Sequence, residues 1–228
     1  MNAPGGNGEP VHAGVLLPWA NSVVEAELHR WAGCAVVWHY ARLMPPSRAT
    51  ALDAAFLAGL LDAVPAALAQ LSALPLQRVY LACTSAAFMY PERARSAARQ
   101  PRVAVVSAFD AITAVLSQRG ASRVVLLAPY PREVTDAEAR MFVHSGVTVT
   151  GCASLGLDDG YRSVTRDQIG ELIGKVSDEA MEKADAIVLS CTGWPTFGPI
   201  QVLQRRLGKP VISSNLARAW HARGTPES

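Results

Sequence analysis

The stretch Val79-Tyr-Leu-Ala-Cys83-Thr-Ser85 decides the fold, because a similar stretch, Ile187-Val-Leu-Ser-Cys191-Thr-Gly193, recurs 108 residues later. Each stretch is a short apolar run followed by Cys-Thr and a small residue. Two further pairs repeat in the same order at nearly the same offset, namely Val15-Leu-Leu-Pro18 with Val125-Leu-Leu-Ala-Pro129, and Val103-Ala-Val-Val-Ser107 with Pro210-Val-Ile-Ser-Ser214. Three matches in one order predict two similar lobes that arose by duplication.

The chain alternates between short apolar runs and longer segments rich in Ala, Leu and Arg. The apolar runs have the length of buried parallel strands, and we expect strands at 12–17, 35–39, 78–82, 102–107, 123–127, 147–150, 186–190 and 210–213. The longer segments predict helices at 22–31, 50–74, 110–119, 135–145, 165–183 and 198–207. At the start of 165–183, Thr165 and Gln168 have the spacing of a capping box. This alternation predicts an α/β protein with mostly parallel sheets.

The predicted domain organisation follows from the repeat. Residues 1–11 are expected to be a disordered leader, because they are mostly Gly, Asn and Pro and lack the features of a secretion signal. Residues 12–109 together with 215–228 are predicted to form an N-terminal lobe with the first Cys motif, and residues 110–214 a C-terminal lobe with the second.

Composition narrows the class of protein. Of the 228 residues, 50% are hydrophobic and 18% charged, with a net charge of +2, which fits a folded body and argues against nucleic acid as a partner. The most apolar stretch, 51–76, is interrupted by Asp and Pro, so no membrane span is expected. The few charges between 50 and 74 favour a homodimer face there. The four cysteines lack the spacing of metal ligands or of a disulfide framework, so we expect no metal site and a cytoplasmic protein. The sequence has neither a glycine-rich phosphate loop nor the context of a Schiff-base lysine, so we also expect no cofactor.

Cys83 and Cys191 each follow a predicted strand at its carboxyl end, where open parallel sheets bind ligands. If the lobes face one another, both thiols reach a shared cleft from opposite sides. The following residues, Thr84-Ser85 and Thr192-Gly193, offer hydroxyls and backbone amides at the start of the next segment, which suits a carboxylate. Two thiols flanking one carbon can act as acid, base or nucleophile without a cofactor. The alternative is that both are ordinary buried cysteines, and the matched positions favour function.

Several motifs resemble the aspartate/glutamate racemase superfamily, in the branch that contains maleate cis-trans isomerases and arylmalonate decarboxylases. The similar segments lie between about residues 14 and 220 and are Pro18-Trp-Ala-Asn21-Ser-Val-Val-Glu25, Ala82-Cys83-Thr84-Ser85, Pro129-Tyr130, Leu189-Ser-Cys191-Thr and Gly208-Lys-Pro-Val-Ile-Ser-Ser-Asn215. The resemblance implies two flavodoxin-like (Rossmann-type) lobes with parallel four-stranded sheets, related by a pseudo-twofold axis, with the active site in the cleft between them.

The resemblance also implies roles for individual residues. Cys83 would be the nucleophile or base on one face of the substrate and Cys191 the acid or base on the other. The ligands of the carboxylate oxygens would be Asn21, Thr84, Ser85, Tyr130, Thr192 and Gly193, which would also stabilise an enediolate-like state. Asn21 is equally suited to cap the helix at 22–31, and Asn215 is expected to cap the last helix.

The sequence departs from the family pattern in three places. The decarboxylases of this branch have glycine at the first cysteine position, so the presence of Cys83 favours an isomerase or racemase. The isomerases have an asparagine in the loop that here reads Leu155-Gly-Leu-Asp-Asp-Gly160-Tyr-Arg, where Arg162 is a candidate substitute. Aromatic residues near the motifs are either core or a wall for a bulkier substrate, and they are Trp19, Phe88, Tyr90, Trp194 and Phe197.

Four functions therefore compete. The first is a cofactor-independent isomerase or racemase of a small carboxylate. The others are a decarboxylase of substituted malonates that needs Cys191 alone, an inactive carboxylate-binding protein of the same fold, and a thiol redox sensor that would need Cys83 and Cys191 within disulfide distance.

Overall fold

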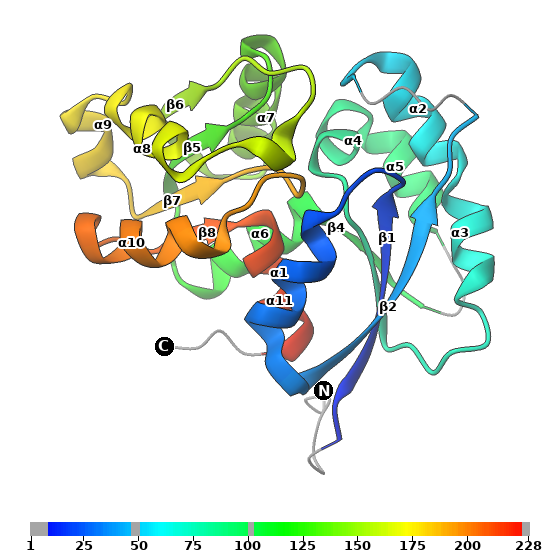
Figure 1. The fold of residues 1–228 in the computed structure, drawn as a ribbon. Coiled ribbons are helices and arrows are strands. Elements are labelled where there is room, and N and C mark those ends of the chain that lie inside the picture. Colours follow the sequence, from blue (N-terminus) through cyan, green and yellow to red (C-terminus); the bar gives the residue numbers. More distant parts are fainter. Residues whose placement is uncertain (1–8, 47–50, 100–102, 225–228) are drawn as a thin grey trace.

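The computed structural model describes residues 9–46, 51–99 and 103–224. Two four-stranded sheets make up its framework, with strand orders β2-β1-β3-β4 and β6-β5-β7-β8, and every pair of neighbouring strands is parallel (Figure 1). The strands of the first sheet are β1 (Val11–Pro18), β2 (Val36–Leu43), β3 (Arg78–Leu81) and β4 (Val105–Ser107). Those of the second are β5 (Arg123–Ala128), β6 (Thr148–Ser154), β7 (Ala186–Leu189) and β8 (Val211–Ser213). The predicted α/β fold with two similar parallel sheets is confirmed.

The central strands are apolar because helices cover both faces of each sheet. All four residues of β7 are buried, and in β5 only Arg123 at the start is exposed. Such strands carry unbroken runs of Val, Ile and Leu instead of an alternating pattern. This explains why the eight runs could be recognised in the sequence.

The helices that cover the sheets are α1 (Val23–Ala32), α2 (Ala54–Asp62), α3 (Val64–Gln70), α4 (Thr84–Met89), α5 (Pro91–Ala98), α6 (Ala108–Gln118), α7 (Arg132–His144), α8 (Arg166–Gly174), α9 (Asp178–Lys183), α10 (Phe197–Leu207) and α11 (Ser214–Arg223). Two short 3₁₀ turns, η1 (Gly33–Ala35) and η2 (Tyr161–Ser163), complete the elements. Among the described residues, no helix has the length and hydropathy of a transmembrane span.

Two of the expected helices are each divided in two. The segment predicted at 50–74 forms α2 and α3, because Pro65 in the first turn of α3 cannot donate a backbone hydrogen bond. The segment predicted at 165–183 forms α8 and α9, since Ser177 starts a new helix by accepting from the amide of Ala180. The capping box of Thr165 and Gln168 is present as predicted. Helices α4 and α5 were not expected, because they are short, with six and eight residues.

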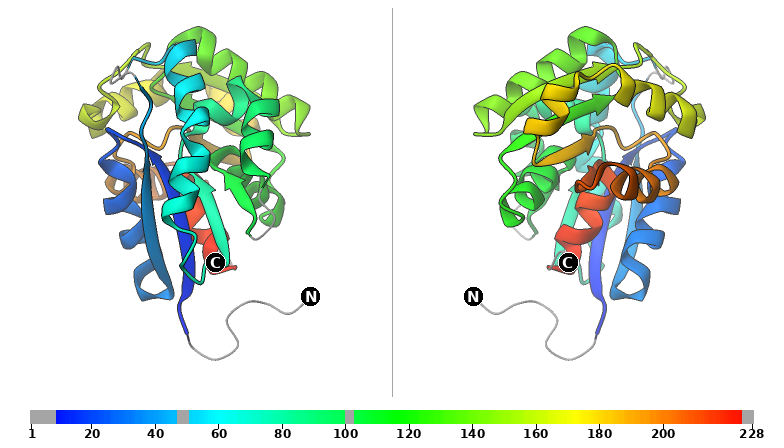
Figure 2. Two further views of the ribbon diagram at one scale, coloured as in Figure 1. Left: turned by 90° about the vertical axis from the view of Figure 1, so that its right-hand side faces the viewer. Right: turned by 90° about the vertical axis from the view of Figure 1, so that its left-hand side faces the viewer.

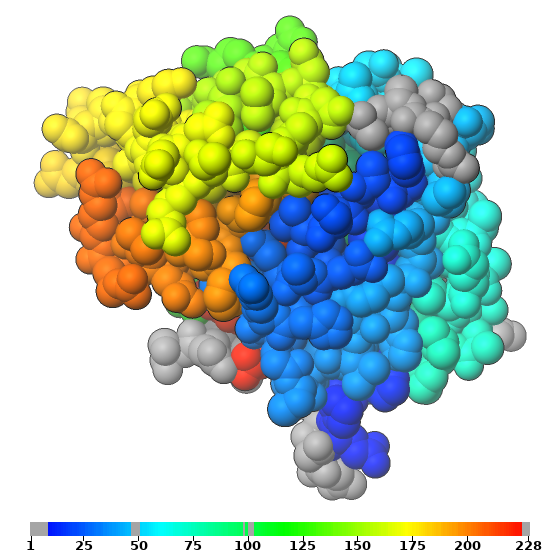
Figure 3. Space-filling view, in the orientation of Figure 1, coloured from blue at the N-terminus to red at the C-terminus, as the bar shows by residue number. Residues whose placement is uncertain are grey.

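The C-terminal helix α11 returns to the first sheet. It packs against α1 and α6 and touches β1 and β2, and the views from either side show it beside the N-terminal strands (Figure 2). Figure 3 shows α1 in contact with α10, which lies between β7 and β8 of the second sheet. The expected lobe boundary between residues 109 and 110 stays a prediction. Most of the expected leader, residues 1–8, lies outside the described residues, as do residue 50 of the predicted helix and residue 102 of the predicted strand.

Candidate active site

A pocket of about 470 Å³ opens where the carboxyl ends of the central strands of the two sheets meet. Its walls come from the segments that follow β1, β3, β5 and β7, together with the start of α2 and the turn η2. It is lined by Pro18, Trp19, Ala20, Asn21, Ser22, Leu52, Phe56, Cys83, Thr84, Ser85, Tyr130, Asp159, Gly160, Tyr161, Arg162, Cys191, Thr192 and Gly193. All eight residues predicted for the site therefore line one pocket, while their chemical roles stay predictions.

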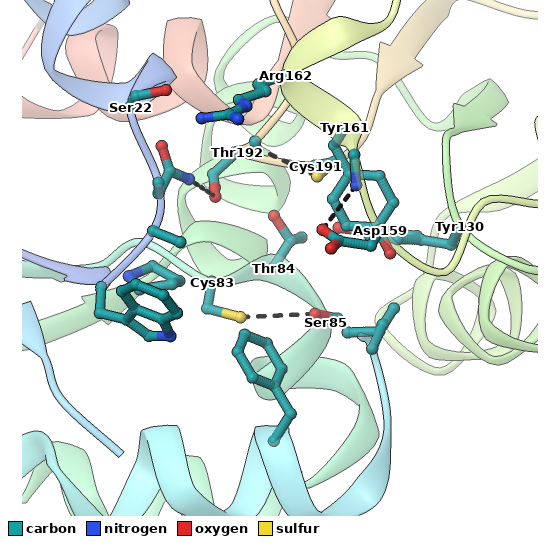
Figure 4. A pocket seen from close by; sticks show the side chains of 18 residues that line it. Ser22, Cys83, Thr84, Ser85, Tyr130, Asp159, Tyr161, Arg162, Cys191 and Thr192 are labelled. Atoms are coloured by element: carbon teal, nitrogen blue, oxygen red, sulfur yellow. Dashed lines mark hydrogen bonds between the residues drawn. The ribbon is translucent and has the colours of Figure 1, made fainter. Parts of the chain in front are cut away.

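Cys83 and Cys191 occupy equivalent places in the two sheets. Each stands two residues beyond the last residue of its strand, β3 or β7, and only 6% and 5% of their surfaces are exposed. In Figure 4 the two Sγ atoms lie on different sides of the Thr84 side chain, on the same pocket. Both are free thiols. This arrangement allows two thiols to face one small ligand.

The backbone of Cys191 is strained, whereas that of Cys83 is not. Cys191 has φ of 130°, the only positive φ outside glycine in the part of the chain that the structure describes, and Cys83 has an ordinary extended backbone. Such a conformation costs about 1–3 kcal/mol and persists where the surroundings impose it. Here the Cys191 amide donates to Ser214 Oγ at 3.1 Å, and the Gly193 amide donates to Cys191 Sγ at 3.2 Å. The strain thus lies in the backbone of the residue that carries the second thiol.

Ser214 also links the two cysteine motifs. Its Oγ lies 3.1 Å from Oγ1 of Thr84, the residue after Cys83, as well as accepting from the amide of Cys191. A single hydroxyl at the start of α11 therefore fixes the two motifs relative to each other.

Burial keeps both thiols protonated in the free protein. It raises the pKa of Cys83, with the Ser85 hydroxyl and the Ala86 amide acting in the opposite direction. Burial also raises the pKa of Cys191 to about 12, partly offset by the Gly193 amide and the Tyr130 hydroxyl. A thiol in this state is a proton donor, and it becomes a base or nucleophile only after its proton has been transferred.

Tyr130 supplies a neutral donor beside Cys191. It is 1% exposed, and burial, followed by the nearby Cys191 and Glu138, raises its pKa well above the ordinary value. Its ring packs edge-on against Tyr161 with 5.7 Å between centroids. The Tyr161 hydroxyl donates to the carbonyls of Leu157 and Asp158, so it serves its own loop. Tyr130 thus keeps its proton and can donate it to a ligand oxygen.

Asn21 performs both of the functions weighed from sequence. Its Oδ1 accepts from the amides of Val23 and Val24, at 3.0 and 3.1 Å, which caps α1. Its Nδ2 donates to Thr192 Oγ1 at 3.3 Å on the pocket wall (Figure 4). The Thr192 hydroxyl in turn donates to the carbonyl of Ala82. Since that hydroxyl is held by protein groups, Thr192 would offer a ligand its backbone.

The most important residue that sequence reasoning missed is Glu27, which connects α1 to the loop after β7. Its carboxylate accepts from the Thr196 amide and hydroxyl, the Phe197 amide and Asn215 Nδ2. A signal for it exists in the sequence, because Glu27 lies on the same helical face as the buried Val23, Val24 and Leu28. An acidic residue on an apolar helical face indicates a buried, paired carboxylate.

Asn215 does not cap the last helix, which corrects the expectation. Ser213 is the cap, since its Oγ accepts from the Leu216 amide. Asn215 is fully buried, donates to Glu27 and to the carbonyl of Thr192, and accepts from Arg218. Asn215 lies two residues after the cap, and its amide donates to the second cysteine loop at the Thr192 carbonyl.

The aromatic wall is also composed differently from the expectation. Of the five aromatic residues singled out in the sequence, only Trp19 lines the pocket. Trp194 is fully buried, Phe88 belongs to the core and Phe197 packs on Trp31. The other rings at the pocket are those of Phe56, Tyr130 and Tyr161. Phe56 was missed because its contact with the pocket depends on how α2 packs on the first sheet.

Arg162 lines the pocket from η2, on the side where Thr192 and Ser22 lie (Figure 4). At another edge of the pocket, the Leu52 amide donates a hydrogen bond to the Asp158 carbonyl at 2.9 Å. Leu52 and Phe56 form an apolar wall on that edge. The pocket therefore combines a cation, an apolar wall and a cluster of neutral donors.

Known proteins resemble this chain in sequence and in fold. Over 105 residues the chain is 36% identical to an arylmalonate decarboxylase from Bordetella bronchiseptica, covering 45% of this chain and 43% of that protein. Over 111 residues it is 33% identical to a maleate isomerase from Geobacillus stearothermophilus, covering 48% and 44%. The aligned part of the chain thus spans less than half the length of these relatives.

A solved structure of Nocardia farcinica maleate cis-trans isomerase, a variant with a covalently bound succinylcysteine intermediate, superimposes on 95% of this chain and 94% of its own. The TM-score is 0.79 and the sequence identity 19%, so this likeness concerns the fold. The model of the arylmalonate decarboxylase family matches residues 55–227, which is most of the chain. The chain belongs to the arylmalonate decarboxylase family.

Proposed function

We propose that the protein is a cofactor-independent isomerase of small carboxylic acids that uses Cys83 and Cys191 on opposite faces of its substrate. The observation that carries this proposal is the placement of one thiol from each sheet on a single pocket. The maleate isomerase among its relatives supports the same reaction class.

The carboxylate of the substrate would be held by neutral donors. Thr84 and Ser85 offer their hydroxyls and the first amides of α4, and Tyr130 offers its hydroxyl. Thr192 and Gly193 offer backbone amides on the other side. Such donors stabilise the extra charge of an enediolate-like state without being deprotonated by it.

For a cis-diacid, the reaction begins when Cys83 loses its proton to the solvent and the resulting thiolate adds to one alkene carbon. The S–C bond forms, the π electrons move to the neighbouring carbon, and Cys191 donates its proton there. Rotation about the new single bond follows, Cys191 takes the proton back, and the C–S bond breaks to release the trans isomer. Addition of a cysteine to maleate followed by protonation gives a succinylcysteine, which is the intermediate bound in the Nocardia farcinica enzyme.

Arg162 would bind the second carboxylate. The loop from Leu155 to Arg162 has no asparagine, and the Arg162 guanidinium is the cation that lines the pocket there. A guanidinium can hold a carboxylate by two parallel hydrogen bonds.

The test is proton NMR of the reduced protein with maleate in deuterated water. We expect fumarate with the wild-type protein and none above background with Cys83→Ala. Cys34→Ala is the matched control, because Cys34 is exposed and lies away from the pocket. Full turnover by Cys83→Ala would contradict two-cysteine catalysis.

The second candidate is a decarboxylase of substituted malonates. The apolar wall of Trp19, Leu52 and Phe56 favours it, because a four-carbon diacid has no substituent to contact this wall. The match to the arylmalonate decarboxylase family model also supports this reaction. Loss of carbon dioxide leaves an enediolate that Cys191 alone can protonate. Release of carbon dioxide from a phenyl-substituted malonate by Cys83→Ala, with none from Cys191→Ala, would establish this reaction.

We further propose a cytoplasmic location, a small carboxylate as the partner instead of a nucleic acid, and a homodimer. The four dispersed free cysteines support the cytoplasmic location, and the near-zero net charge supports a partner other than nucleic acid.

The outer faces of α2 and α3 support the homodimer, since their exposed residues include Ala54, Ala55, Pro65, Ala66 and Ala69. Sedimentation velocity of the wild-type protein and Ala66→Glu tests the dimer, and a wild-type monomer would exclude it.

A further inference from the structure

Glu138 is a buried carboxyl group that the proposed reaction does not use. It lies on α7, eight residues after Tyr130, and none of its surface is exposed. Its Oε1 accepts from Ser190 Oγ at 2.5 Å, and its Oε2 has no hydrogen-bond partner among the described residues. An ionised carboxylate with one oxygen left unsatisfied in a dry interior is strongly disfavoured, so the geometry favours the neutral acid.

The surroundings of Glu138 connect it to the second cysteine. Ser190, its hydrogen-bond donor, directly precedes Cys191 in the chain. Electrostatic interactions join Glu138 to both Tyr130 and Cys191, and these two groups also affect each other's pKa. Glu138 thus lies close to the thiol and the phenol but does not line the pocket.

The elements packed around Glu138 bring no compensating cation. Helix α4, which packs on α7, has no charged residue in its sequence Thr-Ser-Ala-Ala-Phe-Met. In β5 the only charged residue is Arg123 at its exposed start, where it pairs with Asp185. On the β6 side of α7, Asp136 pairs with Arg132 and lies 3.9 Å from Cys152 Sγ. Among the described groups, the titratable neighbours of Glu138 are therefore Tyr130 and Cys191.

We propose that Glu138 is a positioning residue for Cys191, which holds Ser190 in place as the neutral carboxylic acid and, once ionised, opposes formation of the Cys191 thiolate. The inference rests on the proposed role of Cys191. Ionisation of Glu138 would set an upper pH limit for catalysis by Cys191, and no residue that lines the pocket would impose such a limit. Burial raises the pKa of Glu138 to about 8, partly offset by the Ser190 hydroxyl, so the ionisation falls in an accessible range.

The experiment measures the alkylation rate of Cys191 by iodoacetamide as a function of pH, without substrate. In a background of Cys34→Ser, Cys83→Ala and Cys152→Ser, Cys191 is the remaining thiol. The Glu138→Gln variant is compared with this parent protein, and Glu133→Gln is the matched control, because Glu133 is an exposed glutamate of the same helix.

We expect the Glu138→Gln protein to react at the same rate as its parent at about pH 6 and about tenfold faster at about pH 9.5, a difference of one pKa unit in the thiol. The Glu133→Gln profile should coincide with the parent profile. Coincidence of the Glu138→Gln profile with that of the parent at every pH would overturn the proposal. An equal acceleration already at about pH 6 would also overturn it, since Glu138 would then be ionised throughout.

Ser190→Ala provides a second test that leaves the carboxyl in place. Without the Ser190 donor, Glu138 should stay neutral to higher pH, so Cys191 should react faster than in the parent at about pH 8–9 and equally at about pH 6. An unchanged profile would contradict the proposal even if Glu138→Gln fails to fold. Because alkylation needs no turnover, these results are independent of whether any acid is isomerised.

Discussion

Nδ2 of Asn21 donates a hydrogen bond to Oγ1 of Thr192 at 3.3 Å, which joins the segment after β1 to the segment after β7. Thr192 then donates to the carbonyl of Ala82, the residue before Cys83. Three segments that end different strands are thereby connected around one pocket. The relative placement of the two thiols depends on this connection as well as on Ser214.

Substituting Asn21 should separate its two functions. Asn21→Ala removes the cap of α1 and the bond to Thr192, and it should lower the free energy of unfolding by about 1–2 kcal/mol. Asn21→Ser retains a capping oxygen but cannot reach Thr192, so it should lose less stability while still raising KM. Urea unfolding and steady-state kinetics of both variants check this. Equal loss of stability in the two variants would contradict the capping role.

Substituting Glu27 should be strongly destabilising although it lies outside the pocket. Glu27→Gln places an NH2 group opposite donors from Thr196, Phe197 or Asn215, so we expect a loss of about 2–4 kcal/mol in the free energy of unfolding. Glu25→Gln is the control, because Glu25 forms a half-exposed ion pair with Arg42. Loss of this pair should lower the free energy of unfolding by about 1 kcal/mol or less. Similar losses for the two variants in chemical denaturation would be inconsistent with the buried network.

The stability of the protein should fall with rising pH because of Glu138. Its pKa is raised from an ordinary value near 4.5 to about 8, so the folded state keeps a proton that the unfolded state has lost between these values. The contribution is fully present below about pH 4.5 and decreases by about 1.4 kcal/mol per pH unit until about pH 8. The difference in unfolding free energy between wild type and Glu138→Gln, measured across this range, should show this slope. A flat difference would mean that Glu138 is ionised in both states.

Catalysis should accelerate with pH through the neutral range. Burial raises the pKa of Cys83 above its ordinary value, so the thiolate fraction is small at neutral pH and grows about tenfold per pH unit. Tyr130 keeps its proton throughout, so it contributes no decline. The logarithm of kcat/KM should therefore rise with a slope near one from about pH 6 to about pH 8. A rate independent of pH over this interval would argue against a thiolate formed from Cys83.

Arg162 should determine affinity for the second carboxylate. Arg162→Gln is expected to raise KM for a dicarboxylate about tenfold or more with a smaller change in kcat, and to leave stability unchanged because the side chain is exposed. Arg166→Gln, a nearby exposed arginine that does not line the pocket, is the control. A monocarboxylate should show no such difference, and an unchanged KM for the dicarboxylate would remove Arg162 from recognition.

Sequence by itself determined the architecture and the positions of the thiols. The central strands, which are covered on both faces, need unbroken apolar runs, and shorter apolar runs marked the other strands, so all eight strands were expected. The repeat of Cys-Thr after β3 and β7 placed Cys83 and Cys191 at equivalent strand ends, because the carboxyl edge of a parallel sheet is fixed by chain direction.

Only the tertiary structure decided what surrounds those thiols. Glu138 and Ser214 look like ordinary helical residues in the sequence, since their partners lie 52 and 23 residues away in the chain. The helical pattern around Glu27 indicates a buried carboxylate, but its partner Thr196, 169 residues away, is given only by the structure. The positive φ of Cys191 and the hydroxyl partners of Thr192 have no local sequence signal either. Local patterns specify elements because periodicity and capping act over a few residues, whereas burial of a carboxyl group or the closing of a pocket depends on how distant elements pack.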